Sequence, residues 1–227
     1  MARILVVVAH PDDEVLGAGA TIVKHIKEGD EVCILCLADG VTSRGYDPTN
    51  KISREEELVI NKADIDKRKD EMEKAVKMLG VENIKFADFP DQRMDSVPIL
   101  DIIKSIEEVK KEFVPNIVYT HFWGDLNKDH RVTYEAVITA FRVIDGKREA
   151  QIFCFEVPET TGLLPDIENQ FNPNYFVDIK DTISLKIKAV EVYESEKRGY
   201  PHPRSAKAIE KQAASRGNEA GHDVAEA

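Results

Sequence analysis

The chain lacks an excess of basic residues and any long apolar run. Its 31 lysines and arginines are outnumbered by 42 aspartates and glutamates, which gives a formal net charge of −11. This balance argues against a general nucleic-acid binder, because such proteins present a basic face to the phosphates. No apolar stretch approaches the roughly 20 residues that a membrane-spanning helix needs. We therefore expect neither a nucleic-acid partner nor a membrane span.

Cysteines and targeting features are equally scarce. The three cysteines are few and odd in number, so we expect no disulfide framework and a reducing, cytoplasmic location. The N-terminus runs directly into an apolar stretch and shows no secretory signal pattern. Cys33 and Cys36 form a Cys-x-x-Cys inside 31–38, a predicted strand on which residues three apart face opposite sides. We interpret them as core residues, because a redox pair needs a helix N-terminus.

What the chain does contain is typical of one globular α/β domain. It has 227 residues, 42% of them hydrophobic and 32% charged. A strand at 4–8, a helix to about 27 and a strand at 31–38 predict a parallel βαβ unit. The alternation continues with helices at 65–80, 97–113 and 132–143 and strands at 83–87, 116–120 and 151–157. We predict a single Rossmann-like domain with a mostly parallel sheet and helices on both faces.

The remaining segments are less regular. Residues 41–65 form a long charged connection that we interpret as a lid over the carboxyl ends of the strands, with a helical part within 55–63. The core is expected over about 3–180, with a last strand at 176–179. A helical extension follows over about 181–227, with a good helix at 182–196. The stretch 204–227 is predicted to be weakly helical, with no apolar face of its own.

A polar cluster follows the first strand directly. His10, Asp12, Asp13 and Glu14 stand between that strand and the first helix. In open α/β sheets this position faces the ligand crevice. Helix capping needs one carboxylate and leaves His10 and the second acid unexplained. A divalent metal accounts for the whole cluster, because buried acids and imidazoles are costly without a positive partner.

Two further strand ends bring acids and imidazoles to the same rim, at 91–95 and 121–130. Histidine and aspartate from separate loops suit zinc or another borderline divalent ion. A catalytic zinc leaves one position open for water, whose pKa falls to about 7. A carboxylate that does not bind the metal then carries protons. Asp12 and Asp13 fit these two roles, but their spacing does not decide which residue has which role.

The motifs resemble those of the PIG-L/LmbE family of zinc-dependent N-deacetylases. Ala-His-Pro-Asp-Asp-Glu at 9–14 is similar to the first family motif, and Asp-Leu-Asn-Lys-Asp-His-Arg at 125–131 to the second, about 120 residues later. The resemblance spans 3 to roughly 223. It implies a Rossmann-like fold and removal of an acetyl group from N-acetylglucosamine units, which are free, lipid-linked, thiol-linked or part of sugar nucleotides.

The resemblance also implies roles for individual residues. It implies that His10, Asp13 and His130 hold one Zn²⁺ and that Asp12 is the general base. Asp129 would orient a histidine or the water. Further residues resemble positions that contact the sugar in relatives, namely Arg68 and Asp91. The sequence does not separate zinc from iron or cobalt.

The second motif departs from the family pattern at one position. Many relatives read His-Pro-Asp-His there, and the first of those histidines steadies the developing oxyanion. This chain has Asn127, which can donate a hydrogen bond but cannot supply a proton. His202, in Pro-His-Pro-Arg, is our candidate to replace that histidine, although a surface turn between two prolines explains it equally well. His121 is a second choice, for which we favour a buried residue hydrogen-bonded to the backbone.

Four arginines fall on segments that overhang the predicted crevice: Arg44, Arg68, Arg93 and Arg204. Gathered at one rim, they would suit a phosphate-bearing substrate such as a nucleotide sugar. Each alone is more simply explained as a surface ion-pair partner.

The sequence predicts a metal-dependent amidohydrolase that acts on a small N-acetylated sugar. Two alternatives stay open: a metal phosphatase, which usually holds two ions about 3.5–4 Å apart, and a sugar- or nucleotide-binding module without turnover. The missing Gly-x-Gly-x-x-Gly weakens a dinucleotide interpretation. Assembly into a homo-oligomer is left open.

Overall fold

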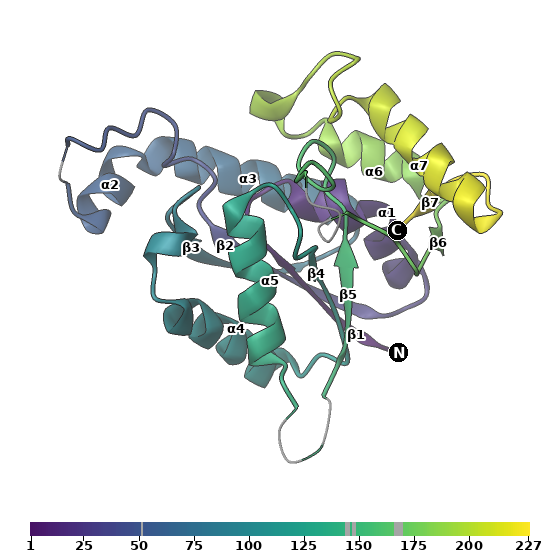
Figure 1. The fold of residues 1–227 in the computed structure, drawn as a ribbon, viewed down its shortest axis with the longest axis horizontal. Helices are drawn as coiled ribbons and strands as arrows, with labels where there is room; N and C mark the ends of the chain where they lie inside the picture. The colour runs from purple at the N-terminus through teal and green to yellow at the C-terminus, as the bar shows by residue number, and fades with distance from the viewer. Residues whose placement is uncertain (51, 144–145, 147–148, 166–169) are drawn as a thin grey trace.

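A computed structural model describes residues 1–50, 52–143, 146, 149–165 and 170–227. Its centre is a sheet of five parallel strands in the order β3-β2-β1-β4-β5 (Figure 1). The strands are β1 (Arg3–Val8), β2 (Glu31–Ala38), β3 (Asn83–Phe89), β4 (Ile117–His121) and β5 (Gln151–Phe155). From β1 the chain adds β2 and β3 on one side, and it then adds β4 and β5 on the other side of β1. Ligands of open α/β sheets bind at this switch in strand order, which here lies between β1 and β4.

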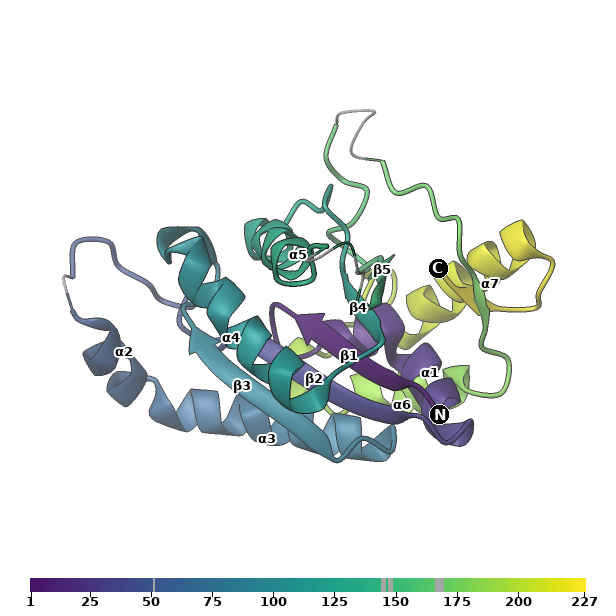
Figure 2. The same ribbon diagram turned by 90° about the horizontal axis from the view of Figure 1, so that it is seen from below.

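Helices cover both faces of this sheet (Figure 2). One face carries α1 (Asp13–Lys27), α3 (Lys62–Met78) and α6 (Ile183–Val190), and the other carries α4 (Ile99–Phe113) and α5 (Lys128–Ala140). From Ile4 to Val8 the side chains of β1 alternate between the two resulting cores and are fully buried, which explains why this stretch is uninterruptedly apolar. The predicted Rossmann-like α/β fold is therefore confirmed.

Cys33 and Cys36 are buried free thiols on opposite faces of β2. Cys36 packs in the core beneath α1, whereas Cys33 packs in the core beneath α4 and α5. This arrangement follows from the alternation of side chains along a strand. The structure confirms that the Cys-x-x-Cys belongs to the core.

The long connection after β2 contains the expected short helix, α2 (Arg54–Ile60), and α3 then begins at Lys62, three residues earlier than predicted. Ser53 caps α2: its hydroxyl accepts the Glu56 N–H, and the Glu56 carboxylate accepts the Ser53 N–H. Figures 1 and 2 show α2 and the loop before it extending away from the body of the molecule. A short 3₁₀ turn, η1 (Met94–Ser96), follows β3.

The C-terminal part differs from the sequence prediction in two respects. The helix expected over 182–196 ends at Val190, and a separate 3₁₀ turn, η3, spans Glu194–Glu196. The expectation that 204–227 has no apolar face is wrong. Helix α7 (Ala206–Ala220) buries Ile209, Ala213 and Gly217, which are four residues apart and share one face. Because two of the three are small, hydrophobicity alone does not reveal this face.

The chain end is fastened to α1 by hydrogen bonds and to α6 by a buried ion pair. A two-stranded antiparallel ladder joins β6 (Val177–Asp178) and β7 (Ala225–Glu226). The Glu226 carboxylate accepts the backbone N–H groups of Ala20 and Thr21, just after a break in α1 at Ala18, and pairs with Lys186 Nζ at 2.6 Å. Glu226 thus satisfies helix donors that the break exposes.

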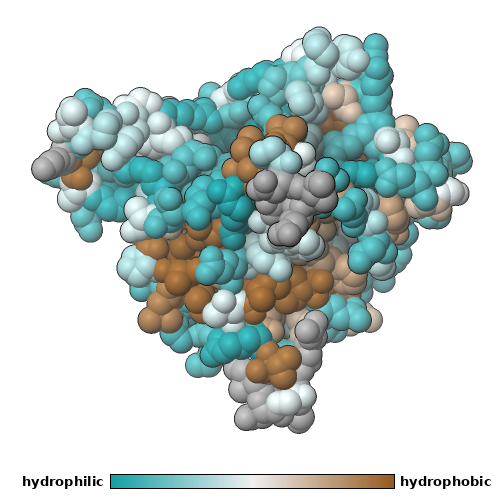
Figure 3. Space-filling view, viewed as in Figure 1, coloured by the Kyte–Doolittle hydropathy of each residue, from teal (hydrophilic) through white to brown (hydrophobic). Residues whose placement is uncertain are grey.

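The surface of the face in Figure 3 is mainly hydrophilic, with hydrophobic patches near α4 and α5. Among the helices of the described residues, none has both the length and the apolar character that crossing a bilayer needs.

Gly17 in α1 lets Phe155 of β5 pack directly on the helix backbone. A Cβ at Gly17 would lie 2.2 Å from the Phe155 ring. We expect Gly17→Ala to destabilise the protein by about 1–3 kcal/mol, as overpacking of a core does. Thermal unfolding of Gly17→Ala beside Gly199→Ala measures this, because a Cβ at Gly199 meets nothing within 4 Å. Equal melting temperatures for the two variants would contradict the close packing.

Candidate metal centre and active site

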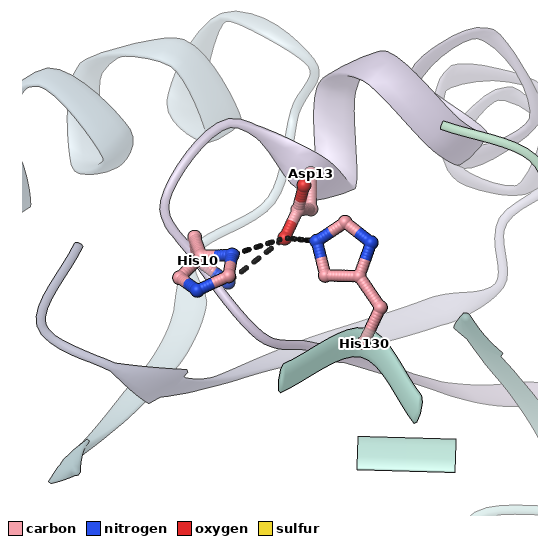
Figure 4. A group of neighbouring side chains, drawn as sticks. All are labelled: His10, Asp13 and His130. Carbon is pink, nitrogen blue, oxygen red and sulfur yellow. Dashed lines mark hydrogen bonds and ion pairs between the residues drawn. The ribbon is translucent and has the colours of Figure 1, made fainter. Parts of the chain in front are cut away.

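Three side chains from separate elements converge at the switch point between β1 and β4. His10 follows β1, Asp13 opens α1 and His130 lies in the first turn of α5. One donor atom from each lies within 4.8 Å of the other two. Asp13 Oδ2 is 3.3 Å from His10 Nδ1 and 3.3 Å from His130 Nε2 (Figure 4). All three side chains are buried.

These separations fit a tetrahedral metal ion. Ligand atoms about 2.0–2.1 Å from zinc stand roughly 3.3 Å apart along a tetrahedron edge. The two contacts of Asp13 Oδ2 have this length, and the donor atoms of all three residues lie within 4.8 Å of one another, so the group matches the dimensions of such a site. Two imidazoles and one carboxylate are also a donor set that zinc accepts.

In each imidazole, the ring nitrogen that points away from Asp13, here called the outer nitrogen, lies beside a carboxylate. Asp129 Oδ2 is 3.0 Å from His10 Nε2, and Asp91 Oδ1 is 3.3 Å from the same atom. Asp125 Oδ1 is 3.2 Å from His130 Nδ1. A carboxylate at the outer nitrogen keeps a proton there, which leaves the inner nitrogen as the atom that would bind a metal ion. Histidine ligands of metals almost always donate their other ring N–H to a carboxylate, a backbone carbonyl or water.

Asp129 is the most firmly held of these carboxylates. It is completely buried and accepts the backbone N–H groups of Gln92 at 2.7 Å and Met94 at 3.0 Å, in addition to its contact with His10. It therefore connects the loop after β3 to a residue that follows β1. His10, Asp91 and Asp129 form a second group of three potential ligands. Because that group shares His10 and because Asp129 is occupied by backbone donors, a single ion fits the site better than two.

Asp12 faces two arginines. Its Oδ2 accepts from Arg68 Nη2 at 2.8 Å and from Arg204 Nη1 at 2.9 Å. The backbone φ of Asp12 is 116°, in the left-handed region that residues other than glycine rarely adopt. Backbone of this kind is often found at functional sites. Burial raises the pKa of the Asp12 carboxyl, and the guanidiniums of Arg68 and Arg204 offset this only in part. Asp12 is thus separated from the His10–Asp13–His130 group by its backbone geometry and by its partners.

The charges inside the group are strongly coupled. Burial alone would raise the pKa of Asp13, but the neighbouring imidazoles, that of His130 above all, outweigh it and hold that pKa well below its usual value. Burial likewise opposes the imidazolium of His10, yet Asp129 and Asp13 raise its pKa well above the usual value. The site therefore keeps Asp13 ionised in a buried position, which is the form that binds a cation.

His121 lies beside the group but has a different environment. It is completely buried, and its Nε2 accepts the Ala9 N–H at 2.9 Å. Its ring stacks on that of His130, with centroids 3.9 Å apart. Burial, together with the neighbouring His130, lowers the pKa of His121 well below its usual value. A neutral ring whose Nε2 lone pair is taken by the backbone matches the buried role that we favoured from the sequence.

The two residues considered for oxyanion binding are placed differently. Asn127 caps α5, and its side-chain oxygen accepts the Asp129 N–H at 2.9 Å. The side chain of His202 is 30% exposed; its Nδ1 accepts the Arg204 N–H at 3.2 Å, and its Nε2 is 3.5 Å from Glu159. His202 thus lies two residues from the arginine that contacts Asp12.

The predicted sugar contacts all have partners within the chain. Arg44 pairs with Glu196 at 2.5 Å, and Arg93 pairs with Glu57 at 2.5 Å. Besides contacting His10, Asp91 accepts from the Ser43 hydroxyl at 2.5 Å. Arg68 is buried against Asp12 and the Pro11 carbonyl. Arg68 and Arg204 therefore lie at the site, but carboxylates neutralise their charges.

Two features of the site were missed by sequence reasoning. Asp125 opens the second motif, and the sequence predicts no role for it, yet its carboxylate lies beside Nδ1 of His130, five residues later. Glu14 is completely buried, accepts the Asp12 N–H at 3.0 Å and a hydrogen bond from the Tyr193 hydroxyl, and burial raises its pKa to about 8. Tyr193 is far away in sequence, and no local signal connects it to Glu14.

The comparison with protein families decides the affiliation. The PIG-L family model, described as GlcNAc-PI de-N-acetylase, matches residues 5–141, which is more than half of the chain. The chain belongs to the PIG-L family. The matched range contains His10, Asp12, Asp13 and His130, and the predicted family is thereby confirmed.

Individual relatives of the PIG-L family agree with this affiliation. The uncharacterized deacetylase YaiS of Escherichia coli is 29% identical over 179 residues, which cover 76% of this chain and 84% of YaiS. The diacetylchitobiose deacetylase of Thermococcus kodakarensis is 29% identical over 203 residues, 86% of this chain and 70% of that protein. The conserved protein TT1542 of Thermus thermophilus has a similar fold, with a TM-score of 0.73 at 24% identity, covering 100% and 93% of the two chains.

Proposed function

We propose that this PIG-L family protein is a zinc-dependent hydrolase that removes the acetyl group from an N-acetylglucosamine-type sugar. The observation that carries the proposal is the His10–Asp13–His130 group, with Asp12 next to it but outside it. A metal-binding module would need only the three ligands. An additional carboxylate at the same edge supplies what hydrolysis requires, a group that carries protons.

The three ligands would hold one divalent ion, which supplies Lewis acidity that polarises an amide carbonyl and lowers the pKa of water. Asp12 removes the proton of the attacking water as the water oxygen bonds to the amide carbon. When the C–N bond breaks, the proton passes to the leaving nitrogen. The products are acetic acid and the free amine, which at neutral pH are acetate and an ammonium ion, so atoms and charge balance.

The surrounding residues position these groups. Asp91, Asp129 and Asp125 keep protons on the outer nitrogens of the two histidines, and Arg68 and Arg204 fix the direction of the Asp12 carboxylate. His202 is our candidate donor to the oxyanion, and Asn127 is a candidate sugar contact together with Arg93 and Arg44. We assign the protein to the cytoplasm, in agreement with its unpaired cysteines.

Metal removal tests the proposed function. We expect acetate release from N-acetylglucosamine or N,N'-diacetylchitobiose to be lost after dialysis against a chelator and restored by Zn²⁺. A coupled assay for acetate, run with an equal concentration of glucose as a substrate without an amide, gives the measurement. Full turnover in metal-free protein, or hydrolysis of a phosphomonoester in place of the amides, would contradict the proposal.

A further inference from the structure

The Glu196 carboxylate lies among four arginine side chains at the side of the candidate active site. Its oxygens are 2.5 Å from Arg44, 3.5 Å from Arg198, 3.6 Å from Arg204 and 3.7 Å from Arg68. Glu196 belongs to the 3₁₀ turn η3, and its side chain is only 14% exposed. One carboxylate is therefore the shared partner of four cations.

The charges of this cluster are balanced. Two of the arginines also contact Asp12, Arg68 lies 3.6 Å from Glu71, and Arg204 lies 2.7 Å from Glu159. Among the described residues, the ion pairs of the four guanidiniums are made with four carboxylates: Asp12, Glu71, Glu159 and Glu196. The cluster therefore has no net positive charge that would attract an incoming anion.

The cluster reaches from the catalytic carboxylate to the solvent. Nη1 of Arg204 contacts both Asp12 Oδ2 and Glu196 Oε2. Arg68 is 5% exposed at the inner end, whereas Arg44 is 52% exposed and Arg198 is 42% exposed at the outer end. For both outer arginines, Glu196 is the carboxylate partner within the part of the chain that the structure describes. Glu196 is thus separated from Asp12 by a single guanidinium group.

We propose that Glu196 determines specificity by neutralising these arginines, so that the site accepts N-acetyl sugars with an uncharged carrier and excludes phosphate-bearing ones. This inference rests on the proposed deacetylase function. Phosphate recognition by arginine depends on a guanidinium whose donors are available for bidentate contact. An incoming phosphate must displace Glu196 and leave that partly buried carboxylate beside a second anion, which is costly.

Removing the Glu196 charge tests the proposal without requiring turnover. Glu196→Gln leaves the cluster with one excess positive charge, held mainly by Arg44 and Arg198. We expect the metal-loaded Glu196→Gln protein to bind inorganic phosphate at least ten-fold more tightly than wild type in calorimetric titrations at low salt. Glu194→Gln makes the same chemical change at an exposed position of the same turn and is expected to bind phosphate as wild type does. Equal phosphate affinities for all three proteins would overturn the proposal.

A kinetic comparison tests the proposal in the wild-type protein as well. Wild type is expected to deacetylate N-acetylglucosamine with a kcat/KM at least ten-fold above that for N-acetylglucosamine 1-phosphate, and Glu196→Gln is expected to narrow that ratio. A wild-type preference for the phosphorylated sugar would overturn the proposal even if the variant fails to fold. Absence of turnover on every N-acetyl sugar would instead reject the proposed function, and the phosphate titration would still decide whether Glu196 repels anions.

Discussion

Asp12→Asn is expected to lower kcat by about 10²–10⁴-fold, the range that general acid–base catalysis contributes, while the metal content of the protein stays at the wild-type level. Asparagine has the shape of aspartate, and its side-chain oxygen can still accept from Arg68 and Arg204. It cannot take a proton from water. Measuring acetate release and metal content on the same preparation separates catalysis from metal binding.

Asp95→Asn is the matched control, because Asp95 is an exposed acid on η1 that the site does not use. It is expected to retain wild-type turnover. If Asp12→Asn kept more than a tenth of wild-type activity, Asp12 would not be the general base. If it lost the metal together with activity, Asp12 would have to be counted among the ligands.

His130→Gln is expected to have the second large effect, the loss of the metal itself. Removing a partner of a ligand typically lowers metal affinity 10–100-fold, so removing a ligand should lower it by more than about 100-fold. Buried Asp13 would also lose the imidazole that stabilises its charge. Competition with a metallochromic indicator measures the affinity, and acetate release should fall in parallel.

His222→Gln provides the comparison, because His222 is 38% exposed and lies 3.8 Å from Asp178 in the C-terminal part of the fold. That variant is expected to bind metal as wild type does. A wild-type metal affinity in His130→Gln would show that the ion binds elsewhere, for example at the group formed by His10, Asp91 and Asp129.

The sequence predicted the parallel sheet because its central strands β1 and β2 are apolar runs and because strand patterns alternate with helix patterns along the chain. It also predicted the group around His10, because polar residues directly after buried strands of a parallel sheet must meet at one edge. The structure brings His10 and His130 to ring centroids 5.3 Å apart, although 120 residues separate them. Strand order and direction alone determine this contact.

Contacts between distant segments were not predictable in the same way. The buried face of α7 consists largely of Ala213 and Gly217, and a stripe of small residues gives no hydrophobic signal. The arginines at the rim were identified from the sequence, but whether each was free or paired depended on carboxylates such as Glu196, more than 100 residues from Arg68. Local propensity carries no information on such pairs.

The most direct test is a crystal structure of the zinc-loaded protein with anomalous data at the zinc absorption edge. The account predicts one anomalous peak, bound by His10 Nδ1, Asp13 Oδ2 and His130 Nε2, with the Asp12 carboxylate close by but not coordinated. A peak bound by Asp12, or one placed between His10, Asp91 and Asp129 with the His130 group empty, would contradict it.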